Sequence, residues 1–175
     1  MTRPFIVGVG GTTRTNSSSE LALEACLARM RALGADTESF SAEALDLPHY
    51  GSARAQSDAR AAKLIEALRR CDGVLLSSPG YHGSISGMLK NALDYVEELR
   101  TDAWPYLDGR AVGVIVCAYG PQTIGTTLVA ARSIIHALRG WPTPMGAGIN
   151  SAIPTFGADG SCLDPAVAAS LSTVA

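Results

Sequence analysis

The chain has 175 residues and 47% hydrophobic content, enough for one buried core and too short for a second full domain, so we expect residues 1–175 to form a single domain. A formal net charge of −2 and scattered basic residues argue against a nucleic-acid partner. No apolar run approaches the roughly 20 residues that cross a bilayer, and the first residues show no leader pattern, so we expect a cytoplasmic protein without membrane binding.

Five short apolar or β-branched runs alternate with segments of helical periodicity, which is typical of βαβ units. Several runs are almost continuously apolar, as in central parallel strands that are covered on both faces. The second run alternates in polarity and suits an edge strand. The expected strands cover residues 4–10, 35–41, 73–78, 111–118 and 143–149, and the expected helices cover residues 17–33, 58–71, 87–99, 125–139 and 164–175.

These elements predict a three-layer α/β domain in which five parallel strands form a doubly wound sheet with the order 2-1-3-4-5. Right-handed crossovers place the connecting helices over both faces of such a sheet. Ligands then bind beyond the carboxyl ends of the strands, where the winding direction switches. We therefore expect the loops after the first, third and fourth strands to form one site.

The first of these loops, "GGTTRTNSSSE", covers Gly10 to Glu20 and leads into the first helix. Unpaired N–H groups and the helix dipole attract an anion there, while the hydroxyl groups and Arg14 can donate hydrogen bonds to a phosphate. The P-loop lysine and a complete G-x-G-x-x-G pattern are absent from the sequence, which leaves a monophosphate as the expected ligand. The alternative is that Asn16 or Ser17 only caps the helix within a polar turn.

The loop after the third strand begins the segment "SSPGYHGSISGMLKNALDYVEEL", residues 77–99. Pro79 and Gly80 end the strand, and Gly83 permits a close backbone approach, which leaves Tyr81 and His82 at the tip. A tight loop of this kind can follow the edge of a planar heterocycle with its backbone N–H and C=O groups. Its aromatic tip can shield the face of that ring.

The pattern G-x-T-x-R-x-x-S-x-S in the first loop, together with "SPGYHGSISGMLKNALDY" after the third strand, resembles the flavodoxin-like NAD(P)H-dependent FMN reductases. This family also contains quinone, azo-dye and chromate reductases, and the resemblance extends to about residue 140. It implies an FMN cofactor and NADPH or NADH as co-substrate. The implied activity is flavin reduction, which supplies reduced flavin to a partner monooxygenase or electrons to a quinone-like acceptor.

The resemblance also assigns roles to individual residues. The helix that contains "LKNALDY" (89–95) usually takes part in a subunit interface in this family, so we expect a homodimer or a tetramer. On chemical grounds, we expect backbone N–H groups of the loops around residues 80–84 and 119–125 to stabilise negative charge on the reduced ring. The expected FMN-binding residues are Thr12, Arg14, Asn16, Ser17 and Ser19 at the phosphate, Pro79, Gly80, Tyr81, His82, Gly83 and Ser84 at the ring, and Tyr119 and Gly120 in the loop after the fourth strand.

The sequence departs from the family pattern in three places. Many members have an acidic residue where this chain has Gly80, and an Asn where it has His82. The loop after the fourth strand commonly contains a Gly-Gly pair in the family, whereas here it reads "AYGPQTIGTT", 118–127. Hydride transfer needs no acid or base, so no catalytic residue is expected, and proton transfer by His82 stays open. Two other functions also stay open. One is a flavodoxin-type electron carrier without turnover, and the other is a flavin-free, phosphate-binding α/β module.

The four cysteines, Cys26, Cys71, Cys117 and Cys162, lie far apart in the sequence, without a C-x-x-C pair or a histidine at a metal-ligand spacing. This distribution predicts reduced thiols in the core or near the surface. It argues against both a disulfide framework and a metal site.

Overall fold

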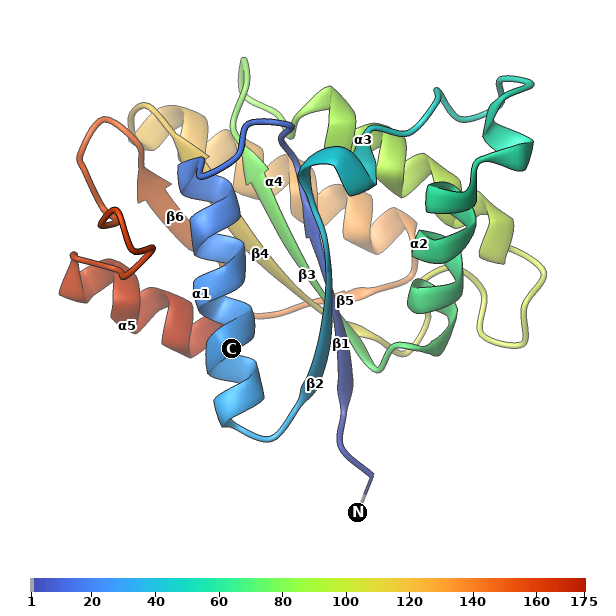
Figure 1. Cartoon of the computed structure of the whole chain (residues 1–175), viewed down its shortest axis with the longest axis horizontal. Helices are drawn as coiled ribbons and strands as arrows, with labels where there is room; N and C mark the ends of the chain where they lie inside the picture. Colours follow the sequence, from blue (N-terminus) through green and yellow to red (C-terminus); the bar gives the residue numbers. More distant parts are fainter. Residues whose placement is uncertain (1) are drawn as a thin grey trace.

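A parallel sheet lies between two layers of helices in the computed structural model, which describes residues 2–175 (Figure 1). The order β2-β1-β3-β4-β5 confirms the predicted winding, and β6 pairs with β4. The fold is therefore flavodoxin-like. The strands are β1 (Phe5–Gly10), β2 (Asp36–Phe40), β3 (Gly73–Pro79), β4 (Ala111–Ala118), β5 (Trp141–Pro142) and β6 (Ala147–Asn150).

Two separate cores form on the two faces of the sheet. One face carries α1 (Ser18–Ala32) and α5 (Pro165–Val174), and the other carries α2 (Ala59–Arg70), α3 (Gly87–Asp94) and α4 (Pro121–Ala137) (Figure 1). The 3₁₀ segments η1 (Ala42–Leu45), η2 (Ala55–Ser57) and η3 (Tyr95–Leu99) lie in the connections.

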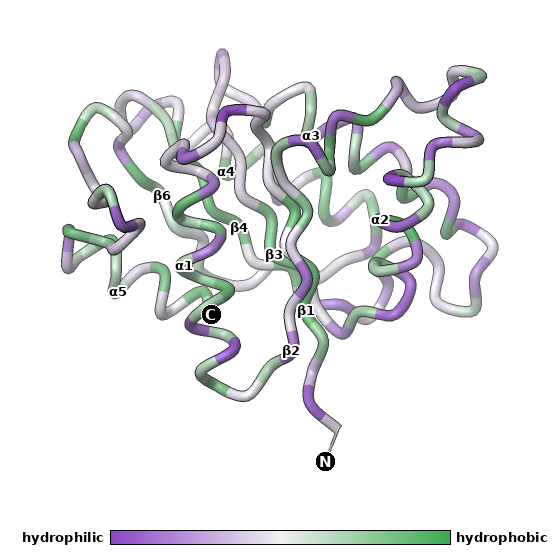
Figure 2. The backbone as a smooth tube through the Cα atoms, viewed as in Figure 1, coloured by the Kyte–Doolittle hydropathy of each residue, from purple (hydrophilic) through white to green (hydrophobic). Residues whose placement is uncertain are grey.

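The central strands are buried on both faces, which explains their continuous apolar sequence. In β3, Val74 and Leu76 belong to the core beneath α2, α3 and α4, whereas Leu75 belongs to the core beneath α1 and α5. All three are at most 2% exposed. Figure 2 shows the same distribution, with hydrophobic residues along β3 and β4 and hydrophilic residues in the outer loops.

The fifth strand differs from the expectation because it is split in two. β5 pairs with Ala111 and Val112, and β6 pairs with residues 115–118 of the same strand, β4. The Thr143 N–H still donates to the Val112 carbonyl of β4 at 3.0 Å, but residues 144–146 leave the ladder, and Pro144 has no N–H to donate. The edge of the sheet is therefore interrupted where one strand over 143–149 was expected.

Most helix boundaries follow the signals in the sequence. Asp58 caps α2 with its side chain, and Gly34 (φ 103°) ends α1 as expected. The helix expected over 87–99 narrows into the 3₁₀ segment η3 after Asp94. The helix expected from residue 125 starts at Pro121 instead, because proline at the first helical position needs no hydrogen-bond acceptor.

All four cysteines are free, as predicted, and three of them are buried. Burial raises the pKa of the Cys26 and Cys117 thiols to about 12. Cys162 is half-buried in the loop before α5. No helix within residues 2–175 has both the length and the apolar content to cross a bilayer.

Candidate functional site

The loops after β1, β3 and β4 meet at the carboxyl ends of their strands, as the winding of the sheet predicts (Figure 1). A Cβ atom on Gly11 would lie 2.8 Å from the Ser86 Oγ and 3.2 Å from the Pro79 Cδ, so the first two loops are in direct contact. The Gly80 N–H donates to the Cys117 carbonyl at 2.8 Å and ties the second loop to the end of β4. The three loops therefore form one continuous surface.

Ser17 caps α1, as the alternative interpretation of the first loop expected. Its Oγ accepts a hydrogen bond from the Glu20 N–H at 3.3 Å. Within residues 2–175, no side chain accepts a hydrogen bond from the N–H groups of Ser18 or Ser19, the first two residues of the helix. Capping therefore uses one of the N–H donors and leaves two for an anion.

The side chains around this helix end add hydrogen-bond donors and a positive charge. Thr12 is 8% exposed, and its Oγ1 accepts from the Arg14 N–H at 3.0 Å, which fixes the turn. The Ser19 hydroxyl is buried and lies 3.3 Å from the Ser17 hydroxyl. The exposed Arg14 guanidinium makes no hydrogen bond or ion pair with any of residues 2–175, so its charge is not neutralised within that range.

Glu20 has a role in this loop that the sequence analysis missed. Its carboxylate accepts from the Asn16 N–H at 2.7 Å and from the Ser41 hydroxyl at 3.2 Å. Ser17 and Glu20 have the S-x-x-E spacing of a capping box, a signal that was available in the sequence. Asn16 adopts a left-handed conformation (φ 56°) to make this contact. The acid thus fixes the loop and is itself satisfied by two donors.

The second loop is a two-residue hairpin. The Tyr81 N–H donates to the Ser84 carbonyl at 3.0 Å, and the Ser84 N–H donates back at 3.1 Å. His82 (φ 52°) and Gly83 (φ 85°) occupy the two central positions, a pattern typical of type I′ turns, which favour Asn and Gly. This geometry accounts for Asn as an alternative to His82. It presents the exposed Tyr81 and His82 side chains at the tip.

Gly80 has a steric reason to lack a side chain. A Cβ atom there would lie 2.9 Å from both the Ala118 Cβ and the Thr127 Oγ1. Because α4 packs so closely against the second loop, the acid found at this position in many relatives does not fit this backbone. The departure at Gly80 is thus a consequence of packing.

The third loop is shorter than expected because α4 starts at Pro121. It consists of Tyr119, which is 76% exposed, and Gly120 (φ 94°). No side chain within residues 2–175 caps this helix. The Thr127 hydroxyl donates to the Ser84 carbonyl at 3.4 Å, which keeps the start of α4 beside the hairpin. A second helix N-terminus, not anticipated from the sequence, therefore borders the surface.

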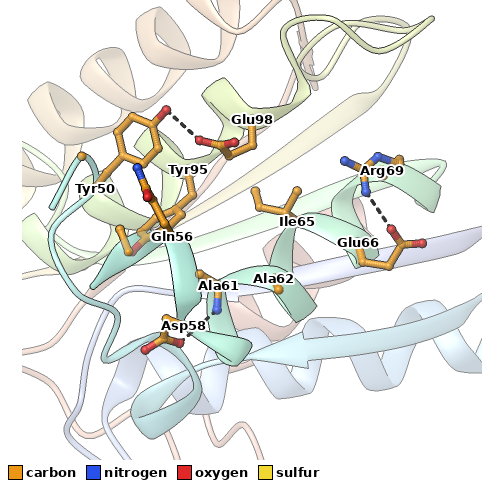
Figure 3. Close-up of a pocket in the computed structure, with 12 residues that line it drawn as sticks. Tyr50, Gln56, Asp58, Ala61, Ala62, Ile65, Glu66, Arg69, Tyr95 and Glu98 are labelled. Atoms are coloured by element: carbon orange, nitrogen blue, oxygen red, sulfur yellow. Dashed lines mark hydrogen bonds and ion pairs between the residues drawn. The ribbon is translucent and has the colours of Figure 1, made fainter. Parts of the chain in front are cut away.

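Two cavities lie outside most of the predicted site. The smaller, about 450 Å³, is lined by Asn16, Leu21 and residues 156–160. The larger, about 810 Å³, lies between α2, η3 and the segment around Tyr50 (Figure 3). Asn16 is the one predicted site residue that lines either cavity.

Comparisons with known proteins agree with this architecture. A family model described as NADPH-dependent FMN reductase matches residues 4–152. A protein named NADPH azoreductase from Bacillus sp. (strain OY1-2) is 44% identical over 52 residues. That match covers 29% of this chain and 29% of the azoreductase, so it is confined to one part of each protein.

Solved structures share the fold over nearly the whole chain. The apo form of an NADH:FMN oxidoreductase (EMOB) has a TM-score of 0.77 at 20% identity, covering 98% of this chain and 86% of that one. FerB, a flavoenzyme NAD(P)H:(acceptor) oxidoreductase from Paracoccus denitrificans, has a TM-score of 0.73 at 24% identity, covering 97% and 92%. At these identities the likeness establishes the fold.

Proposed function

Because the chain belongs to the NADPH-dependent FMN reductase family, we propose that it binds FMN and catalyses the reduction of flavin by NADPH or NADH. Residues 1–175 form one flavin-binding domain in this proposal. The observation that carries it is the loop after β1, which offers a guanidinium and two backbone N–H groups without partners among residues 2–175, together with several hydroxyl groups. Such a donor set suits a terminal phosphate.

The phosphate of FMN would be held by the loop between β1 and α1. Arg14 would supply a charged fork of donors, and Ser18 and Ser19 would supply backbone N–H groups. The Thr12 hydroxyl already accepts a hydrogen bond from the backbone, so it still has its own proton to donate. The Ser17 and Ser19 hydroxyls share one hydrogen bond, which leaves one proton of the pair to donate. The residues present therefore fit this group.

The ring of FMN would lie against the second and third loops. Pro79 to Ser84 form a rigid hairpin whose backbone can meet the ring edge, and the side chains of Tyr81 (56% exposed) and Tyr119 are available for stacking. Bound FMN would supply the hydride acceptor for the nicotinamide. The uncapped first turn of α4 would stabilise negative charge that develops beside it. Since hydride transfer moves no proton, we assign no catalytic side chain.

The electrons would leave either with dissociating reduced flavin, for a partner monooxygenase, or through a bound quinone-like acceptor. The names of two similar proteins, an azoreductase and an NAD(P)H:(acceptor) oxidoreductase, support small-molecule acceptors. The net charge of −2 is small, whereas electron-carrier proteins usually dock through strongly acidic surfaces, so the charge argues against an electron carrier. A cytoplasmic location is consistent with this chemistry and is part of the proposal.

The assembly would be a homodimer in which the layer of α3 and α4 contributes to the interface. The outward positions of α4 include Gly125, Val129, Ser133 and Ala137, all exposed and uncharged. No charged residue occurs from residue 111 to residue 131. Depletion of charge is typical of the centre of a subunit interface.

Anaerobic reduction tests the proposed activity. We expect the purified protein to bind added FMN, and we expect NADPH or NADH to bleach the flavin absorbance when no electron acceptor is present. When a quinone is added, we expect many turnovers of nicotinamide oxidation. A flavin that stays oxidised with either nicotinamide would favour the electron carrier. A protein that binds no FMN would favour the flavin-free module.

A further inference from the structure

The larger cavity has the size and the walls of a small-molecule site. Its volume of about 810 Å³ is within the range of about 300–1,000 Å³ that is typical of ligand pockets. Ala61, Ala62 and Ile65 of α2 form an apolar floor, and polar side chains stand at its two ends (Figure 3). None of the residues expected to bind flavin lines this cavity.

The aromatic end of the cavity is held in place by hydrogen bonds from α3 and η3. Asn91 accepts from the Tyr50 N–H at 2.9 Å and donates to the Pro48 carbonyl at 3.0 Å. The Tyr95 hydroxyl donates to the same carbonyl at 2.8 Å. The rings of Tyr50 and Tyr95 meet edge to face with their centroids 5.2 Å apart. This wall is therefore preorganised, which lowers the entropic cost of binding.

Most of the charged side chains that line the cavity are neutralised by ion pairs, and one carboxylate is not. Glu66 and Arg69 pair with each other at 2.7 Å at the far end (Figure 3), and Asp58 pairs with Arg60 at 2.8 Å. Glu98, at the aromatic end, has no cationic partner within residues 2–175 and accepts one hydrogen bond, from the Tyr50 hydroxyl at 3.0 Å. One carboxylate beside two tyrosine rings is thus available to a ligand.

The Tyr50 hydroxyl keeps its proton and remains a donor to Glu98. Partial burial and the Glu98 carboxylate raise its pKa above the usual value of a tyrosine. The ring therefore stays neutral and offers its electron-rich face at physiological pH. An electron-rich ring and a carboxylate both attract the same ligand group, a positively charged nitrogen.

We propose that this cavity is a second ligand site that binds an amphipathic organic cation, with its ammonium group between the Glu98 carboxylate and the Tyr50 ring, which the buried Tyr95 ring supports from behind. The apolar body of the ligand would lie over Ala61, Ala62 and Ile65. The cavity is a half-open cleft that ends at the Glu66 and Arg69 ion pair, and its volume suits a small molecule. The proposal does not rest on the reductase activity, because none of the residues expected to bind flavin lines the cavity.

Calorimetric titration of the full-length protein with three probes tests the proposal. Benzyltrimethylammonium supplies the cation, N,N-dimethylbenzamide is a neutral aromatic control, and benzenesulfonate is an anionic control. We expect saturable binding of the cation, weaker binding of the neutral probe and no binding of the anion. Glu98→Gln keeps the shape and the acceptor for Tyr50, and we expect it to weaken cation binding about fivefold, as for a solvent-accessible ion pair.

Two further variants distinguish the contribution of the Glu98 charge from those of a neighbouring charge and of the Tyr50 ring. Glu97→Gln removes a neighbouring carboxylate that pairs with Arg100 outside the cavity, and it should leave cation binding unchanged. Tyr50→Leu removes a ring and should weaken the cation more than the neutral probe. FMN affinity should be the same in all three variants, so a failure of this proposal is distinguishable from a failure of the reductase proposal.

Several outcomes would overturn the cation site. One is a cation that binds no more tightly than the neutral probe, and another is an equal loss of binding in Glu98→Gln and Glu97→Gln. A third is an assembly state that changes with Glu98→Gln in analytical ultracentrifugation, because the cavity would then be part of a contact between copies of the chain.

Discussion

Replacing Arg14 with alanine removes the one charged side chain that the loop after β1 offers to a phosphate. Arg14 is exposed, and its guanidinium is unpaired within residues 2–175, so the substitution breaks no internal ion pair there. The loop keeps its shape in the variant, because the contact to Thr12 comes from the backbone N–H of residue 14. The change therefore probes ligand binding with little effect on folding.

The size of the effect follows from the number of donors that remain. A hydrogen bond to a charged group contributes about 1.5–3 kcal/mol, and solvent exposure of Arg14 places it at the lower end. About 1.5 kcal/mol corresponds to an approximately tenfold rise in the Kd for FMN. The N–H groups of Ser18 and Ser19 stay in place, so binding is weakened and not abolished.

Quenching of flavin fluorescence measures the effect with FMN and riboflavin in parallel. Riboflavin lacks the phosphate, so its affinity should be nearly unchanged in Arg14→Ala. Arg31→Ala is the matched control, because Arg31 lies in the last turn of the same helix and contacts Thr37 at 2.7 Å. An equal loss of affinity for the two ligands, or an equal effect of the two substitutions, would refute the phosphate assignment.

Three further predictions follow from packing and burial. Gly80→Ala should lower the free energy of unfolding, measured in urea, by about 1–3 kcal/mol, because the added Cβ would lie 2.9 Å from Ala118 and Thr127. Gly87→Ala should have little effect, because a Cβ at that position has no neighbour within 4 Å. Equal effects of the two substitutions would contradict the packing argument. In the native protein a disulfide reagent should label Cys162 rapidly and the three buried cysteines only after unfolding, and rapid labelling in Cys162→Ser would contradict this. Val129→Glu should dissociate the proposed homodimer in analytical ultracentrifugation while Val129→Thr preserves it, and an unchanged assembly would place the interface elsewhere.

Local signals in the sequence predicted most of the sheet and the positions of the loops. Continuous apolar runs identified β3 and β4 because both faces of these strands are buried. Pro79 and Gly80 marked the end of β3, and the hairpin from Tyr81 to Ser84 follows directly. These features depend on a few consecutive residues, which is why the sequence alone revealed them.

The features that the sequence did not reveal have identifiable causes. The start of α4 was missed because Gln122 and Thr123 interrupt the apolar periodicity, although Pro121 at the first helical position is a recognisable start signal. The split of the last strand depends on pairing with β4, a contact between residues far apart in the sequence.

The cavity beside Tyr50 depends on distant contacts in the same way. It forms where residues 50–56 meet α2 and η3, and no periodicity within any one of these segments indicates it. Its walls come together only in the folded chain, through contacts such as that between Asn91 and the Tyr50 N–H.

A crystal structure of the protein with FMN tests the central claim most directly. We expect the phosphate to contact the Arg14 guanidinium and the N–H groups of Ser18 and Ser19, and we expect the ring to lie against residues 79–84 with Tyr119 beside it. A flavin bound elsewhere, for example in the cavity between α2 and η3, would contradict the account. So would a phosphate that points away from α1.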